Sequence, residues 1–171
     1  MKKTQLLTMC MGLLMLGYMS QSCQEPATST GLTEFIADST TFSGFTSWPL
    51  VNTTTGPSTE LGAMAHGAAD STVSRDVYYK DNQGLVNGAY PVGTLIAKRI
   101  YNPSGTITGY FGMAKRGNNF NPTHNDWEWF KLDATGKILK NAAGMEERGG
   151  LSMTGCNNCH SGATNDYSFS K

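Results

Sequence analysis

Hydrophobic and polar residues alternate along four short segments of the chain, which is the pattern of strands with one face on a core. These segments span residues 73–79, 94–101, 106–114 and 127–132. The intervening Asn-Pro-Ser-Gly at 102–105 and the Asp-Ala-Thr-Gly at 133–136 predict turns, the second followed by a return strand at 137–139. The pattern therefore predicts an antiparallel sheet.

Helical patterns in the chain are short by comparison. Residues 33–37 predict one helical turn with Thr33 as its N-cap, and residues 52–57 predict a loop. The 20 glycines among 171 residues also favour a turn-rich protein over a helix bundle. We therefore expect a mainly β fold (β-rich α+β), in which an antiparallel sheet is accompanied by a few short helices.

The N-terminal region predicts an export signal. Lys2 and Lys3 precede an apolar run at 6–18, which is too short to cross a bilayer and is typical of a signal peptide. The run ends in Ser20-Gln21-Ser22-Cys23, which resembles the cleavage site of bacterial lipoproteins, although an aliphatic residue is usual where Ser20 stands. The alternative is an ordinary signal peptide followed by a spare cysteine.

This interpretation divides the chain into three parts. Residues 1–22 form a lipoprotein-type signal peptide, residues 23–31 form a polar tether that begins with an acylated Cys23, and residues 32–171 form one domain. We expect an exported protein on the periplasmic or cell-surface side, held to the membrane by its lipid anchor. Because 13 basic residues balance 13 acidic ones, no charge favours nucleic acid as a partner.

The sequence Cys156-Asn157-Asn158-Cys159-His160 carries the strongest chemical signal. Cys-x-x-Cys-His is the attachment motif of a c-type haem, in which both cysteines form thioethers with the vinyl groups and the histidine binds the iron. A disulfide between Cys156 and Cys159, or a zinc site, are the alternatives. A zinc site would need two further ligands, and a redox-active disulfide would need a βαβ context that the sequence lacks. The motif therefore predicts one covalently bound haem c near the C-terminus.

Further short segments give the chain a resemblance to a known family. These are Tyr90-Pro91-Val92-Gly93-Thr94, Lys98, Lys115-Arg116-Gly117, Phe120-Asn121-Pro122, Asp126-Trp127-Glu128, the haem motif and Asp166-Tyr167-Ser168-Phe169. In this order and spacing, from about residue 42 to the end, the chain resembles the cytochrome P-460 family, which includes the cytochromes c′-beta. The resemblance implies a β-rich fold, a homodimer and one c-type haem per subunit, with His160 on one side of the iron and the other side open.

The resemblance also implies that Lys98 contacts the haem. Lys98 alternates in phase with Ile96 and Ile100, although burying an unpaired ammonium group is unfavourable. Members of the P-460 type carry a lysine at this position that is bonded to the edge of the porphyrin. In the alternatives, the Lys98 amine extends to solvent or pairs with a haem propionate.

The distal side of the haem is predicted to be apolar. Hydroxylamine-oxidising members place a carboxylate above the iron, but residues 106–114 contain no Asp or Glu. Registering the chain on Phe120 and Trp127 puts Phe111 at that position, so Phe111 either contacts the haem or is an ordinary core residue. His124 lies in a polar loop and is predicted to be at the surface, and no role follows for His66.

Three functions stay open. The first is a mono-haem c-type cytochrome with an open distal site that binds or converts small nitrogen species or gases such as nitric oxide. The second is an enzyme that oxidises hydroxylamine or nitric oxide and needs a cross-linked Lys98 and a proton acceptor. The third is a simple periplasmic electron carrier, for which Met113 would be the sixth iron ligand.

Overall fold

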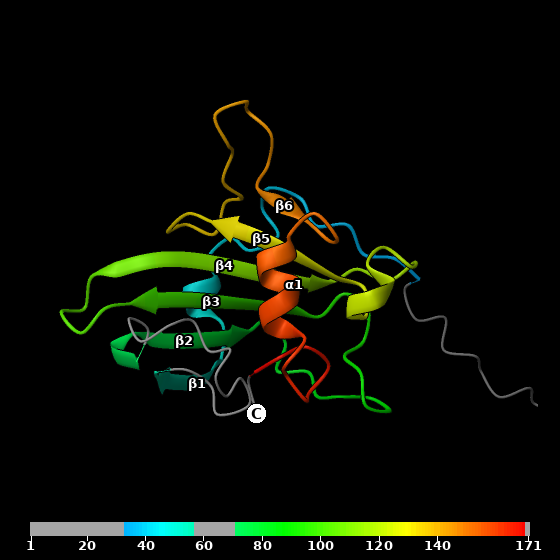
Figure 1. Cartoon of the computed structure of the whole chain (residues 1–171), viewed down its shortest axis with the longest axis horizontal. Helices are drawn as coiled ribbons and strands as arrows, with labels where there is room; N and C mark the ends of the chain where they lie inside the picture. The colour runs from blue at the N-terminus through cyan, green and yellow to red at the C-terminus, as the bar shows by residue number, and fades with distance from the viewer. Residues whose placement is uncertain (1–32, 57–70, 170–171) are drawn as a thin grey trace, which may run out of the picture.

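A computed structural model describes residues 33–56 and 71–169, which form a six-stranded antiparallel sheet. The strands follow one another in sequence order across the sheet (Figure 1). Their bounds are Leu50–Thr55 (β1), Ser74–Tyr79 (β2), Leu95–Tyr101 (β3), Ile107–Lys115 (β4), Trp127–Leu132 (β5) and Arg148–Gly149 (β6). The mainly β fold and the four segments of alternating hydrophobicity are thus confirmed, as β2 to β5.

The loop predicted at residues 52–57 is wrong, because Leu50–Thr55 forms β1 at the edge of the sheet. β1 pairs with β2, and its residues are exposed or half-buried. An edge strand has little core contact, so its Asn-Thr-Thr-Thr sequence shows no hydrophobic alternation from which a strand could be predicted.

The helical turn predicted at residues 33–37 is also wrong. This segment is extended, since Glu34 forms a β-bridge with Gly117 and the Phe35 amide donates to the Arg116 carbonyl at 2.8 Å. The Arg116 side chain also binds the Glu34 carboxylate at 3.0 Å. Pairing with a distant segment thus overrides the local capping signal.

The return strand predicted at 137–139 is reduced to a single bridge, between Ile138 and Leu132. The described residues contain three short helical elements, in agreement with the expected few short helices. They are the 3₁₀ helices η1 (Phe45–Ser47) and η4 (Pro122–His124) and the α-helix α1 (Thr154–His160). Within the described residues, none is long and apolar enough to span a membrane.

The two faces of the sheet carry two separate hydrophobic clusters. Cluster A, on the face covered by the segment that contains η1, has ten buried residues: Ala37, Phe42, Phe45, Tyr78, Leu95, Ala97, Ala114, Phe130, Leu132 and Ile138. Cluster B, on the opposite face, has six: Tyr79, Tyr90, Ile96, Met113, Trp127 and Trp129. Alternate residues of β2 to β5 contribute to each cluster, as the pleat of a strand requires.

Helix α1 lies on cluster B, where Met153 and Cys156 pack against the buried aromatic residues. In Figure 1, α1 crosses in front of β3, β4 and β5 with its axis across the strands. The helix that carries the Cys-x-x-Cys-His motif therefore packs against one face of the sheet. The predicted signal peptide, Cys23 and the tether lie outside the described residues.

Candidate functional site

The Cys-x-x-Cys-His motif occupies the C-terminal part of α1. Cys156 and Cys159 are three positions apart on the helix, so both side chains emerge on the same side of it. Both cysteines and His160 are half-buried, and no disulfide joins the two sulfur atoms. The helix thus presents two thiols and an imidazole together at the surface of the sheet.

A buried asparagine within the motif fixes this helix to the sheet. The Oδ1 atom of Asn157 accepts a hydrogen bond from the Trp129 indole at 2.7 Å and one from Asn121 at 3.2 Å, while its Nδ2 donates to the Gly150 carbonyl at 2.9 Å. Because Asn157 is only 3% exposed, losing these partners would leave buried polar groups unpaired. Sequence reasoning missed this role, since the partners come from separate segments.

The imidazole of His160 is oriented by the chain that follows α1. Its Nδ1 atom lies 2.7 Å from the backbone carbonyl oxygen of Tyr167. A carbonyl oxygen can only accept, so Nδ1 carries the hydrogen and Nε2 carries the lone pair of the neutral ring. The rings of Trp129 and Phe169 lie 4.5 and 5.2 Å from the imidazole, centroid to centroid. This is the tautomer of a histidine that binds a metal through Nε2.

Lys98 and Phe111, the two predicted haem contacts, are direct neighbours. They pair across β3 and β4, and the next residue in the same row is Lys131 of β5. The Lys98 ammonium nitrogen lies 5.7 Å from the centroid of the Phe111 ring. This row is on the same face as α1 and cluster B, because it is two residues along each strand from Ile96, Met113 and Trp129.

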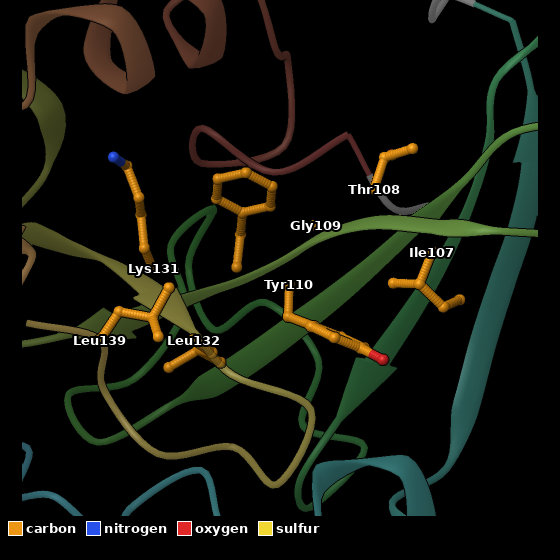
Figure 2. A pocket seen from close by; sticks show the side chains of 8 residues that line it. Ile107, Thr108, Gly109, Tyr110, Lys131, Leu132 and Leu139 are labelled. Atoms are coloured by element: carbon orange, nitrogen blue, oxygen red, sulfur yellow. The ribbon is translucent and has the colours of Figure 1, made fainter.

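A shallow hollow of about 470 Å³ opens to solvent beside this row and includes Phe111 and Lys131, but not Lys98. Figure 2 shows Lys131 and Thr108 pointing to one side of the strands, and Tyr110 and Leu132 to the other. The hollow is lined by Ile107, Thr108, Gly109, Tyr110, Phe111, Lys131, Leu132 and Leu139. None of these lining residues is acidic. The nearby carboxylate of Glu147 binds the Lys131 ammonium at 2.6 Å, and sequence reasoning missed this pair.

The thiol of Cys156 is influenced by the charges of Lys98 and Lys131. Burial raises the pKa of the Cys156 thiol, while the positive charges of Lys98 and Lys131 act in the opposite direction. Burial therefore favours the protonated form of the Cys156 thiol. The structure therefore brings Lys98, Phe111 and Lys131 close to the helix that carries the motif, although these residues are far apart in the sequence.

The other residues considered from the sequence lie elsewhere. Met113 is 6% exposed and packs inside cluster B, which gives its thioether a packing role. His124 is half-buried, and its ring lies 5.5 Å from that of Tyr167, centroid to centroid. His66 and Cys23 lie outside the described residues.

The donor set fits a covalently bound haem, for which His160 has a ring nitrogen free to act as an axial ligand. Residues 33–56 and 71–169 contain no group of three or more His, Cys, Asp or Glu side chains that could hold a metal ion. A haem needs only one axial protein ligand, because the porphyrin supplies the other four, and His160 has the required tautomer. No protein-family model, curated protein or solved structure matches the chain.

Proposed function

We propose that this protein is a mono-haem c-type cytochrome with an open distal site that binds or converts small nitrogen species or gases such as nitric oxide. Cys156 and Cys159 would hold the haem, and His160 would be its axial ligand. The observation that carries the proposal is the hydrogen bond from His160 Nδ1 to the Tyr167 carbonyl, because it leaves Nε2 as the ligating nitrogen. When bound, the haem would supply an iron that exchanges electrons and coordinates small molecules.

The side chains around the hollow support a neutral ligand. Phe111 provides an apolar wall, and the lining residues contain no carboxylate that could accept a proton. Lys98 and Lys131 add two positive charges at the edge, which suit the propionate groups of a haem. The resemblance to the cytochrome P-460 family supports the same assignment and implies a homodimer.

Covalent attachment tests the proposal directly. The full chain should be expressed in a bacterium that matures c-type cytochromes and analysed by intact mass after denaturation. The mass of one haem should remain on the wild-type protein and be lost from the Cys156→Ser/Cys159→Ser variant. His160→Met is the matched control, because it keeps both thioethers and changes only the axial ligand. Haem that extracts from the wild-type protein into acidified solvent would overturn the proposal.

Ligand binding tests the open distal site. The reduced protein should bind carbon monoxide and nitric oxide, and Phe111→Ala should raise the association rate several-fold by removing the apolar wall. Tyr101→Phe is the matched control, since Tyr101 does not line the hollow and its hydroxyl contacts Asp76. Stopped-flow mixing measures both rates. A wild-type iron that already has Met113 as its sixth ligand would instead favour a simple electron carrier.

A second candidate is an enzyme that oxidises hydroxylamine or nitric oxide with a haem cross-linked to Lys98. The position of the Lys98 ammonium beside Phe111 favours it, and Glu147, one ion pair away from the hollow, is a candidate proton acceptor. Lys98→Arg keeps the charge but cannot form the same bond. A changed absorption spectrum and lost hydroxylamine turnover in Lys98→Arg, with Lys131→Arg unaffected, would establish this candidate over the first.

Membrane attachment through Cys23 is part of the proposal for residues 1–31. The predicted signal peptide and tether would place the haem domain on the periplasmic or cell-surface side. Cys23→Ser should release a soluble exported protein, because acyl chains provide the anchor. Fractionation and detection of acylation by mass measure this, with Cys10→Ser as the matched control. An unchanged membrane fraction of Cys23→Ser would contradict lipidation.

A further inference from the structure

An ion pair between two residues outside the Cys-x-x-Cys-His motif fixes the segment that follows α1. The Nζ atom of Lys115 in β4 binds both carboxylate oxygens of Asp166, at 2.9 and 2.8 Å. The side chain of Asp166 is completely buried and that of Lys115 is 8% exposed. Removing one partner of such a pair would leave an uncompensated buried charge, so the two residues hold β4 and the C-terminal segment together.

Asp166 also accepts hydrogen bonds from two other segments. The Tyr90 amide donates to it at 2.6 Å, and the Asn125 side chain donates to it at 2.7 Å. Its own backbone carbonyl accepts from the Trp127 indole at 2.7 Å. Three donor groups make four hydrogen bonds to the carboxylate and a fourth group binds the carbonyl, so both the side chain and the backbone of residue 166 are fixed against the sheet.

The backbone at this point is held in an unfavourable conformation. Asp166 and Tyr167 have φ angles of +49° and +63°, which side-chain-bearing residues rarely adopt. Two successive left-handed residues persist only where the surroundings enforce them. Tyr167 directly follows Asp166. The two left-handed residues turn the chain so that the Tyr167 carbonyl oxygen lies 2.7 Å from His160 Nδ1.

We infer that Asp166 and Lys115 are positioning residues, which hold the Tyr167 carbonyl in place to fix the tautomer and orientation of the His160 imidazole. The inference rests on the proposed function where it concerns an iron ligand, but the tautomer itself can be measured without one. A strong hydrogen bond from Nδ1 makes the imidazole a better donor, which stabilises the ferric state. Asp166 and Lys115 therefore set the reduction potential from outside the motif.

Nuclear magnetic resonance with ¹⁵N-labelled histidine tests this inference on the full chain as purified, whether or not haem is attached. The chain has three histidines, so a His66→Gln/His124→Gln background leaves His160 as the only signal. Asp166→Asn should speed exchange of the Nδ1 hydrogen with water by about tenfold, the factor that one net hydrogen bond is worth. If Asp166→Asn does not fold, the exchange rate of the His160 Nδ1 hydrogen is measured in Asn125→Gly instead. It removes one donor to Asp166 and permits the φ of +51° at residue 125.

Asp76→Asn is the matched control. Asp76 is also a buried carboxylate paired with a cation, Arg99, but the pair is near cluster A on the opposite face. This variant should lose stability and leave exchange at His160 unchanged. Exchange at His160 that is unchanged in folded Asp166→Asn or Asn125→Gly, or that rises equally in Asp76→Asn, would overturn the inference.

The haem-loaded protein gives a second reading. The reduction potential should rise in Asp166→Asn and stay constant in Asp76→Asn, because only the first weakens the donor strength of His160. Wild-type protein that carries no haem would contradict the proposed function alone, since the exchange measurement still decides the inference. Faster exchange with an unchanged potential would overturn the claim that Asp166 sets the potential.

Discussion

The two faces of the same sheet differ in how completely they are covered. On the cluster A face, Phe42 is fully buried and lies over Gly112, where an added Cβ atom would come within 2.8 Å of the ring. On the opposite face, the neighbouring Phe111 is half-buried beside two lysines. Residues 111 and 112 are adjacent in β4 and point in opposite directions. One strand therefore supplies tight packing on one side and an accessible site on the other.

This division separates the densely packed face of the sheet from the face that carries the proposed haem site. Cluster A is filled by large aromatic residues in direct contact, such as Phe42 and Phe130, whose ring centroids are 4.9 Å apart. Cluster B supports α1 on the other face, where Lys98 and Phe111 are half-buried and Lys131 is exposed. We expect substitutions on the first face to affect folding, and substitutions in the row to affect ligands.

The largest expected effect is that of Phe42→Ala. It should lower the free energy of unfolding by about 3–5 kcal/mol, because the truncation opens a cavity in a fully packed region. Phe111→Ala is the matched variant on the other face and should cost only roughly 1 kcal/mol, since the ring is only half-buried. Urea unfolding measures both values, and equal losses would contradict the difference between the faces.

A smaller effect concerns acid stability near cluster A. Burial opposes ionisation of Asp76, but hydrogen bonds from Arg99 and Thr53 outweigh it and lower the pKa of this carboxyl group. Because the folded-state pKa is below the unfolded-state value, ionised Asp76 stabilises the fold fully above pH about 4, and this contribution is lost as the pH falls through the folded-state pKa. Asp76→Asn should therefore cost about 1–3 kcal/mol at neutral pH and less in acid.

Urea unfolding of the wild type and Asp76→Asn at a series of pH values measures this difference. The free energies of unfolding of the two proteins should converge as the pH falls. Asp81→Asn is the control, since Asp81 is an exposed carboxylate outside the strands. A constant difference between wild type and Asp76→Asn across the acid range would show that Asp76 is not the group responsible.

The smallest expected effect is at the edge of the hollow. Glu147→Gln removes the partner of Lys131, whose side chain is 46% exposed. Exposed ion pairs contribute little, so the free energy of unfolding should fall by less than about 1 kcal/mol, and less still in high salt. Thermal unfolding at two salt concentrations measures it. A loss as large as that of Phe42→Ala would mean that the row also has a main structural role.

Part of the fold could be predicted from local pattern. The four segments with alternating hydrophobicity became β2 to β5, because each has one side chain in two on a buried face. The pattern failed at β1, which is polar because it is an edge strand, and at Glu34, which pairs with Gly117 instead of starting a helix. In both cases, partners distant in sequence decide the conformation.

The candidate site shows the same limit. The motif itself predicted the two thiols and the imidazole, and the phase of Lys98 with Ile96 predicted the face on which it lies. The register of β3, β4 and β5, which is set by the tertiary structure, placed Lys98, Phe111 and Lys131 in one row. No local pattern predicts the hydrogen bonds of Asn157 or the ion pair of Glu147, because their partners lie on other segments.

The sequence by itself thus determined the strands with one buried face and the residues of the Cys-x-x-Cys-His motif, since these depend on neighbours a few positions apart. Only the tertiary structure decided which way the motif faces and what orients it. The Tyr167 carbonyl reaches His160 because Lys115, in a different strand, holds Asp166. Such contacts depend on how distant segments pack together, and a local sequence pattern does not show this packing.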